Sequence, residues 1–150
     1  MSAKEGVHCF LPLRVLLAED EALIAVSLAD LLEAEGHDVH LAPDGLTALA
    51  AARRLGADLD VLVTDLNMPG MTGEDLMRTL SADRPSLPVV VVTGSAPYGG
   101  LEAVRRQSGG HRPLTLLHKP FASATLVSAL RDAAALAAGR RPERRAERES

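Results

Sequence analysis

Five short apolar runs alternate along the chain with segments whose apolar residues recur at helical spacing. The runs are aliphatic and partly β-branched, which favours buried strands, and the four consecutive valines from Val89 are the clearest case. The intervening segments repeat apolar residues every three or four positions, as one face of a helix does. The expected strands are 14–18, 38–41, 61–64, 89–92 and 114–118. The expected helices are 22–35, 46–55, 72–83, a short one at 101–107 and a last one from Phe121 onward.

This alternation predicts an α/β fold, a parallel sheet with helices on both faces. Gly36, Gly56 and Gly139 stand where three helices should end, and Ser123 is expected to be the N-cap of the last helix. We interpret residues 1–13 as an N-terminal arm, 14–138 as one domain and 139–150 as a charged, disordered tail. The short helix at 101–107 lies in a stretch rich in Gly, Ser and Pro, so we expect it to be short or poorly formed.

Composition excludes several classes of protein. A chain of 150 residues builds one sizeable core, and with 47% hydrophobic but only 2% aromatic residues that core must be aliphatic. The five arginines and three glutamates of 139–150 leave a formal charge of −6 on the rest of the chain, which argues against nucleic-acid binding. Cys9 is the single cysteine, and we find neither a signal peptide nor a membrane-spanning run. We therefore expect a cytoplasmic protein.

Polar side chains follow four of the five expected strands at the point where each strand ends. Glu19 and Asp20 follow the first strand, Asp65 the third, Thr93 the fourth and Lys119 the fifth. In a parallel sheet these ends meet at one edge, which is where ligands bind. Three carboxylates so close together repel one another, and a hard divalent cation such as Mg²⁺ relieves that repulsion. The space between metal, lysine and threonine then suits a phosphoryl group.

This arrangement predicts phosphoryl transfer to Asp65. Its carboxylate would attack the phosphorus of a donor, while the metal and Lys119 stabilise the charge on the phosphoryl oxygens. The product is an acyl phosphate, which water can later hydrolyse at the same metal. The predicted site therefore both accepts a phosphoryl group and limits how long that group stays bound.

Four motifs carry a resemblance to a known family: A-E-D-E at 18–21, V-T-D-L-N-M-P-G-M-T-G at 63–73, V-V-V-V-T-G at 89–94 and H-K-P-F at 118–121. In this order and spacing they resemble the receiver domain of two-component response regulators, over residues 14–138. The resemblance implies a flavodoxin-like sheet of strand order 2-1-3-4-5. It also implies that the donor is a phosphohistidine of a sensor histidine kinase or a phosphotransfer protein, and that the output is a downstream protein partner.

The resemblance also implies roles for single residues. Asp65 would be the phosphoacceptor and Asp20 a direct Mg²⁺ ligand, with Glu19 acting mainly through water and the main-chain carbonyl of Asn67 completing the metal ligands. Thr93 and Lys119 would contact the phosphoryl oxygens, and the Lys119–Pro120 bond would be cis. Asn67 and Ser95 would flank the path of the attacking water and affect the lifetime of the phosphate. Self-phosphorylation from small donors and autodephosphorylation are the only reactions expected.

One position departs from the family. Receivers usually carry an aromatic residue three positions before the lysine, and here that position holds Leu116. The chain's one tyrosine, Tyr98, stands in the T-G-S-A-P-Y-G-G loop after the fourth strand, which partly resembles that of a receiver-only subgroup. We hypothesise that Tyr98 and the glycines after it supply the moving element instead.

Three functions fit these residues. The first is a stand-alone receiver, because few residues follow the last helix. The second is the receiver of a hybrid kinase, which passes phosphate on to a phosphotransfer protein. The third is a haloacid dehalogenase-like phosphatase, but that class places a second Asp two positions after the nucleophile, where this chain has Asn67. A homodimer stays open, because receivers dimerise through surfaces that one sequence does not mark.

Overall fold

The computed structural model describes residues 12–94, 99–109 and 112–140. Its strands are β1 (Arg14–Ala18), β2 (Asp38–Ala42), β3 (Val61–Thr64), β4 (Val89–Thr93) and β5 (Leu114–His118). Its helices are α2 (Ala22–Ala34), α3 (Gly45–Leu55), α4 (Gly73–Leu80), α5 (Gly100–Ser108) and α6 (Ser123–Arg140), with a 3₁₀ turn, η1 (Gly56–Asp58), before β3. Every expected strand and helix is present.

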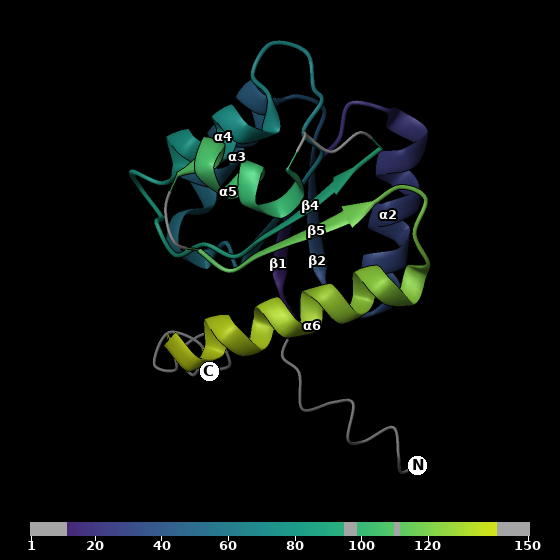
Figure 1. Cartoon of the computed structure of the whole chain (residues 1–150). Coiled ribbons are helices and arrows are strands. Elements are labelled where there is room, and N and C mark those ends of the chain that lie inside the picture. Colours follow the sequence, from purple (N-terminus) through teal and green to yellow (C-terminus); the bar gives the residue numbers. More distant parts are fainter. Residues whose placement is uncertain (1–11, 95–98, 110–111, 141–150) are drawn as a thin grey trace.

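The five strands form one parallel sheet in the order β2-β1-β3-β4-β5, which confirms the predicted α/β fold and its flavodoxin-like strand order. Figure 1 shows α2 and α6 on one face of the sheet and α3, α4 and α5 on the other. Alternate residues of each strand point to opposite faces, so the sheet separates two aliphatic cores. Leu16, Leu62 and Val91 belong to the core under α3, α4 and α5, whereas Leu17 and Val63 belong to the core under α2 and α6.

Strand register brings the carboxyl ends of the strands level with one another. Ala18 at the end of β1 lies opposite Thr64 at the end of β3, and Thr93 at the end of β4 lies opposite His118 at the end of β5. The residues directly after β1, β3 and β5 therefore emerge at one edge of the sheet. These are Glu19, Asp65 and Lys119.

Several expected boundaries shift. Leu13, the last residue of the expected arm, is buried, and its N–H donates to His37 Nδ1 (3.1 Å) because the chain is already packed before β1 begins. Ser123 is the first helical residue of α6 rather than its N-cap, since the carbonyl of Ala122 accepts the Thr125 N–H (2.9 Å). The same helix continues through Gly139 to Arg140. Most of the expected arm and tail lies outside the described residues.

One shorter feature agrees with expectation. The helix in the Gly-rich region, α5, is short at nine residues and begins after Gly99, whose φ is +96°. No helix of the described residues is long and apolar enough to cross a membrane.

Candidate functional site

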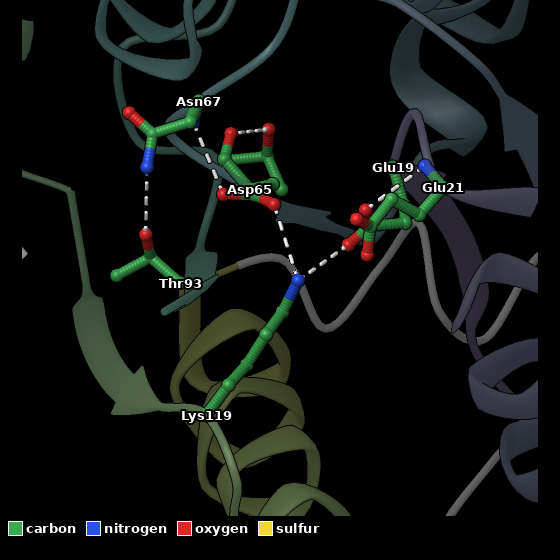
Figure 2. A network of polar contacts seen from close by, with 7 residues as sticks. Glu19, Glu21, Asp65, Asn67, Thr93 and Lys119 are labelled. Carbon is green, nitrogen blue, oxygen red and sulfur yellow. Dashed lines mark hydrogen bonds and ion pairs between the residues drawn. The ribbon is translucent and has the colours of Figure 1, made fainter. Parts of the chain in front are cut away.

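Asp65 is held rigidly where β3 ends. Its N–H donates to the carbonyl of Ala18 in β1 (3.1 Å), and its own carbonyl accepts the hydroxyl of Thr64 (2.8 Å). The residue is buried, but its carboxylate faces the edge of the sheet where the other polar side chains gather (Figure 2). Its position is therefore set by the sheet and by the turn that follows.

Gly73 fixes that turn from the other side. Its N–H donates to the carbonyl of Leu66 (3.0 Å), and a Cβ added to it would lie 2.3 Å from the carbonyl oxygen of Asp65. A side chain at this position would thus displace Asp65 or unfold the turn. Gly73 was not among the predicted site residues, although a glycine directly after Thr72, the N-cap of α4, is a visible signal of close packing.

Lys119 joins two of the carboxylates. Its Nζ lies 3.0 Å from Oε1 of Glu19 and 3.1 Å from Oδ2 of Asp65, and Figure 2 shows its side chain reaching between them. The two carboxylate side chains are 0% and 9% exposed and the lysine side chain 21%, so water screens these ion pairs little. The lysine comes from the loop after β5 and brings a positive charge into the centre of the site.

Glu19, Asp20 and Asp65 form the acidic cluster that the sequence predicts. One carboxylate oxygen from each lies within 4.8 Å of the others. Glu19 and Asp65 are buried and Asp20 is exposed, so the cluster opens to solvent on the side of Asp20. Glu19 is also anchored by the N–H of Glu21, which donates to its Oε2 (3.1 Å). Oxygen ligands of this kind suit Mg²⁺, and the donor set therefore fits that ion.

Burial acts in opposite directions on the pKa values of Glu19 and Lys119, but the net pKa of both groups is raised. Burial raises the pKa of Glu19 above 4.5, and the hydrogen bonds from Lys119 and from the Glu21 N–H only partly offset that rise. Burial alone would lower the pKa of Lys119, but its hydrogen bonds to Glu19 and Asp65 outweigh burial and raise the pKa above 10.5. Lys119 therefore keeps its positive charge at neutral pH.

Asn67 connects the acceptor to the end of β4. Its N–H donates to Oδ1 of Asp65 (3.1 Å), and its Nδ2 donates to Oγ1 of Thr93 (3.4 Å), as Figure 2 shows. Thr93 is in turn tied to Lys119, whose N–H donates to the carbonyl of Thr93 (2.8 Å). The link between the Asn67 side chain and Thr93 was not predicted, because no pattern in the sequence pairs two polar side chains across strands.

The remaining predicted residues divide into two groups. Leu116 lies on β5 opposite Val91 and packs, partly buried, against the core under α3, α4 and α5. The Lys119–Pro120 bond is cis, as the resemblance implied. Ser95 and Tyr98 lie outside the described residues.

A hollow of about 670 Å³ opens beside Asp20. Its walls are the N-cap and first turn of α3, with Asp44 and Leu46, and the turn after β3, with Pro69 and Gly70. The acidic cluster is therefore approachable from solvent between these two turns.

A family model described as "Response regulator receiver domain" matches residues 15–131. The chain belongs to this family. It is a receiver domain of two-component systems, and a signalling module of this kind is not a classical enzyme. The membership sets aside the haloacid dehalogenase-like phosphatase. Receiver domains bind Mg²⁺ in an acidic pocket, and this receiver has such a cluster. They also interact with sensor kinases and downstream partners.

Known receivers and their relatives agree with this assignment. The receiver is 36% identical over 124 residues to the probable transcriptional regulatory protein TcrX of Mycobacterium tuberculosis (80% of this chain, 49% of TcrX). It is 31% identical over 118 residues to the sensor kinase CckA of Brucella abortus (79% of this chain, 12% of CckA). It thus spans about half the length of the one relative and about an eighth of the other.

Solved structures give the same picture. The chemotaxis protein CheY4 of Vibrio cholerae matches with a TM-score of 0.71 at 27% identity, covering 82% of this chain and 99% of that one. The receiver domain of the hybrid histidine kinase CckA matches with a TM-score of 0.65 at 29% identity, covering 80% and 97%.

Proposed function

We propose that this receiver accepts a phosphoryl group on Asp65 from the phosphohistidine of a sensor kinase or a phosphotransfer protein. The observation that carries the proposal is the placement of Lys119, whose ammonium contacts both Asp65 and Glu19 inside a cluster of three carboxylates. A carboxylate buried on a rigid strand end, beside a charged lysine, suits nucleophilic attack on phosphorus.

Mg²⁺ would be held by the carboxylates of Asp20 and Asp65 and by the main-chain carbonyl of Asn67, with Glu19 acting mainly through water. The support is the oxygen-only donor set, with three carboxylate oxygens within 4.8 Å of one another. When bound, the ion offsets the charge of the carboxylates and of the phosphoryl oxygens.

The residues of the receiver then divide the work. An oxygen of Asp65 attacks the phosphorus, the N–P bond to the donor histidine breaks, and its electron pair stays on the imidazole nitrogen. Lys119 exchanges a carboxylate contact for a phosphoryl oxygen, and the Thr93 hydroxyl donates to another. Asn67 and Ser95 are expected to flank the path of the hydrolytic water, so substitutions at both positions should affect the lifetime of the acyl phosphate.

Two exposed apolar side chains support docking of the donor on α2. Leu23 and Val26 follow Asp20 closely and are 85% and 51% exposed. Because they stand three positions apart on one helix, they share a face and offer a partner an apolar contact beside the site. Leu23→Asp should therefore slow phosphorylation by a phosphorylated kinase while leaving labelling by acetyl phosphate unchanged. Equal slowing with both donors would contradict docking at this surface.

Intact mass after incubation with acetyl phosphate and Mg²⁺ tests the chemistry directly. We expect one phosphoryl adduct, absent from Asp65→Asn and from a sample stripped of metal. Asp83→Asn is the matched control, because Asp83 is an exposed carboxylate after α4 that pairs with Arg53 on the surface (3.1 Å), away from the acidic cluster.

Beryllofluoride supplies the second arm of this test. It mimics the phosphoryl group without a transfer step, so its binding to folded receiver with Mg²⁺ should follow the same dependence on Asp65. A folded protein that takes neither the adduct nor beryllofluoride would mean that the domain does not switch by phosphorylation.

The switch itself is proposed to differ from that of most receivers. Leu116 replaces the aromatic residue whose rotation usually accompanies phosphorylation, and we propose that the loop of Tyr98 moves in its place. Backbone amide shifts of that loop should change when beryllofluoride binds. Unchanged shifts there, together with shifts around Leu116, would contradict the proposal.

A second candidate is the receiver of a hybrid kinase, which hands its phosphate to a phosphotransfer protein. The similarity to CckA in both sequence and structure favours it. The two candidates differ in the fate of the phosphoryl group. Rapid loss from Asp65 only when a histidine-containing phosphotransfer protein is added supports the relay, whereas a long-lived adduct that recruits a protein partner supports the stand-alone regulator. Size exclusion of both forms tests the homodimer.

A further inference from the structure

Arg112 is a buried cation at the sheet edge opposite the acidic cluster. The residue lies just before β5 and is 2% exposed. One guanidinium nitrogen, Nη2, donates to Oγ of Ser81, whereas Nε and Nη1 make no hydrogen bond to any of the residues described. No ion pair found among those residues includes Arg112, and burial lowers the pKa of its guanidinium. Two strong donors therefore have no hydrogen-bond partner among the described residues.

Ser81 presents its hydroxyl to this cation from the end of α4. Its Oγ donates to the carbonyl of Met77 (3.1 Å) and accepts from Arg112. The residue is half-buried, and Ala82 and Asp83 after it are exposed. The hydroxyl thus lies between the buried guanidinium and a turn that solvent reaches.

Further arginines lie where α4 packs against α5, an interface called the seam below; the two helices lie side by side in Figure 1. Arg78 donates to the carbonyl of Gln107 through Nη2 (2.5 Å), and Arg105 donates to the carbonyl of Arg112 (3.1 Å). Arg78 also pairs with Asp75 (2.9 Å), but Arg105 and Arg112 appear in none of the ion pairs of the described residues. Two of the three arginines therefore have no carboxylate partner among the described residues, and Nε and Nη1 of Arg112 donate to none of those residues.

A tetrahedral oxyanion matches those donors, because a planar guanidinium binds two oxygens of a phosphoryl group at once. A free anion would have to pass into a space where Nε and Nη1 have almost no exposed surface. A phosphoryl group bonded to Oγ of Ser81 would already be in contact with Arg112. The burial of Arg112 therefore favours a phosphoryl group bonded to Ser81 over a free anion.

We propose that Ser81 is a second phosphorylation site, modified by a Ser/Thr protein kinase, and that the phosphate then pairs with the guanidinium of Arg112. The hydroxyl oxygen of Ser81 attacks the γ-phosphorus of ATP, the bond to the leaving ADP breaks, and the hydroxyl proton passes to a base of the kinase. The segment R-T-L-S at 78–81 places an arginine three residues before the serine, where basic-directed kinases bind one. The product is a stable ester of roughly two negative charges, unlike the labile acyl phosphate of Asp65.

Phosphorylation of the whole folded chain is the first test. We would use the Asp65→Asn background, so that no acyl phosphate forms, with Mg·ATP and a protein kinase that requires arginine at the third position before serine. We expect one adduct, mapped to Ser81, lost in Ser81→Ala and kept in Ser86→Ala, a matched exposed serine of the same turn. Adducts elsewhere, or none on the folded chain while a peptide of residues 76–86 is labelled, would overturn the site.

The second test is a double-mutant cycle with Tm as the measured quantity. It combines Arg112→Met with phosphoserine installed at position 81 during translation. In the unmodified chain, Arg112→Met should hold or raise Tm, because it removes an unpaired buried charge. With phosphoserine at 81, the same substitution should lower Tm by about 5 °C, since it removes the partner of the phosphate. An equal effect of Arg112→Met in both backgrounds would overturn the pairing.

Inorganic phosphate separates the two sources of the anion. If it raises the Tm of Ser81→Ala and this rise disappears when Arg112→Met is added, the seam takes a free anion and the role of Ser81 is overturned. No rise beyond that seen in equimolar chloride supports the covalent group.

Discussion

Replacing Lys119 by methionine would leave two buried carboxylates without their shared cation. Nζ of Lys119 lies 3.0 Å from Glu19 and 3.1 Å from Asp65, both almost fully shielded from water. At an effective dielectric of about 20, each contact corresponds to roughly 5 kcal/mol of Coulomb energy before desolvation is subtracted. Removing one partner of a buried pair typically costs about 3–5 kcal/mol. Because the lysine side chain is 21% exposed, we expect the lower end, about 3 kcal/mol.

The loss should depend on pH and on metal. Burial already raises the pKa of Glu19, and removal of the ammonium raises it further. The folded variant then holds a proton that the unfolded chain has lost, so its stability falls as pH rises from 4.5 through the raised pKa. The stability lost on Lys119→Met should therefore be smaller at pH 5 than at pH 8. Mg²⁺ at a hundred times its dissociation constant should return about 2.7 kcal/mol.

Urea unfolding of Lys119→Met at the two pH values, with and without Mg²⁺, measures these effects. Arg53→Met is the matched control, because Arg53 pairs with Asp83 at the same 3.1 Å but on the surface, where such a pair contributes about 0–1 kcal/mol. Equal losses in the two variants, or a Lys119→Met loss that neither pH nor Mg²⁺ changes, would refute this account of the site's electrostatics.

Three further outcomes follow from the structure. Gly73→Ala should slow labelling of Asp65 by acetyl phosphate and lower Tm, since its Cβ would meet the Asp65 carbonyl. Gly36→Ala should lower Tm through its φ of +98° but leave the labelling rate unchanged, because no atom lies near its Cβ. Thr72→Ala should cost about 1 kcal/mol in urea unfolding through the lost cap on Asp75 N–H (3.2 Å), whereas Thr72→Ser should keep it. The pKa of His37 is lowered by burial, so stability should fall as pH drops below 6.5; His37→Asn should flatten that fall, and an unchanged slope would contradict it.

The strands, the helices and the polar residues at the strand ends could be read from the chain, whereas the strand order was implied by the family resemblance. Four of the five apolar runs are followed by a polar residue, and parallel pairing brings those ends to one edge whatever the details of packing. The predicted gathering of Glu19, Asp20, Asp65 and Lys119 is what the structure shows. Local patterns sufficed here because they fix both the strand and its direction.

The exact ends of the helices could not be predicted from the sequence, because a helix end depends on a few hydrogen bonds that competing residues can satisfy equally well. The expected N-cap at Ser123 was wrong because the chain turned one residue earlier, at Ala122. Leu13 was assigned to the arm, yet the core extends past the start of β1 and buries it.

Contacts between distant side chains came only from the tertiary structure. Lys119 and Glu19 stand 100 residues apart, and their ion pair depends on side-chain directions that periodicity does not encode. The contact of Gly73 with Asp65 and the burial of Arg112 against Ser81 are of the same kind. Sequence patterns report which face of an element is apolar, whereas the partner of each polar group is decided by how the finished elements pack, since burial makes every unpaired donor or charge costly.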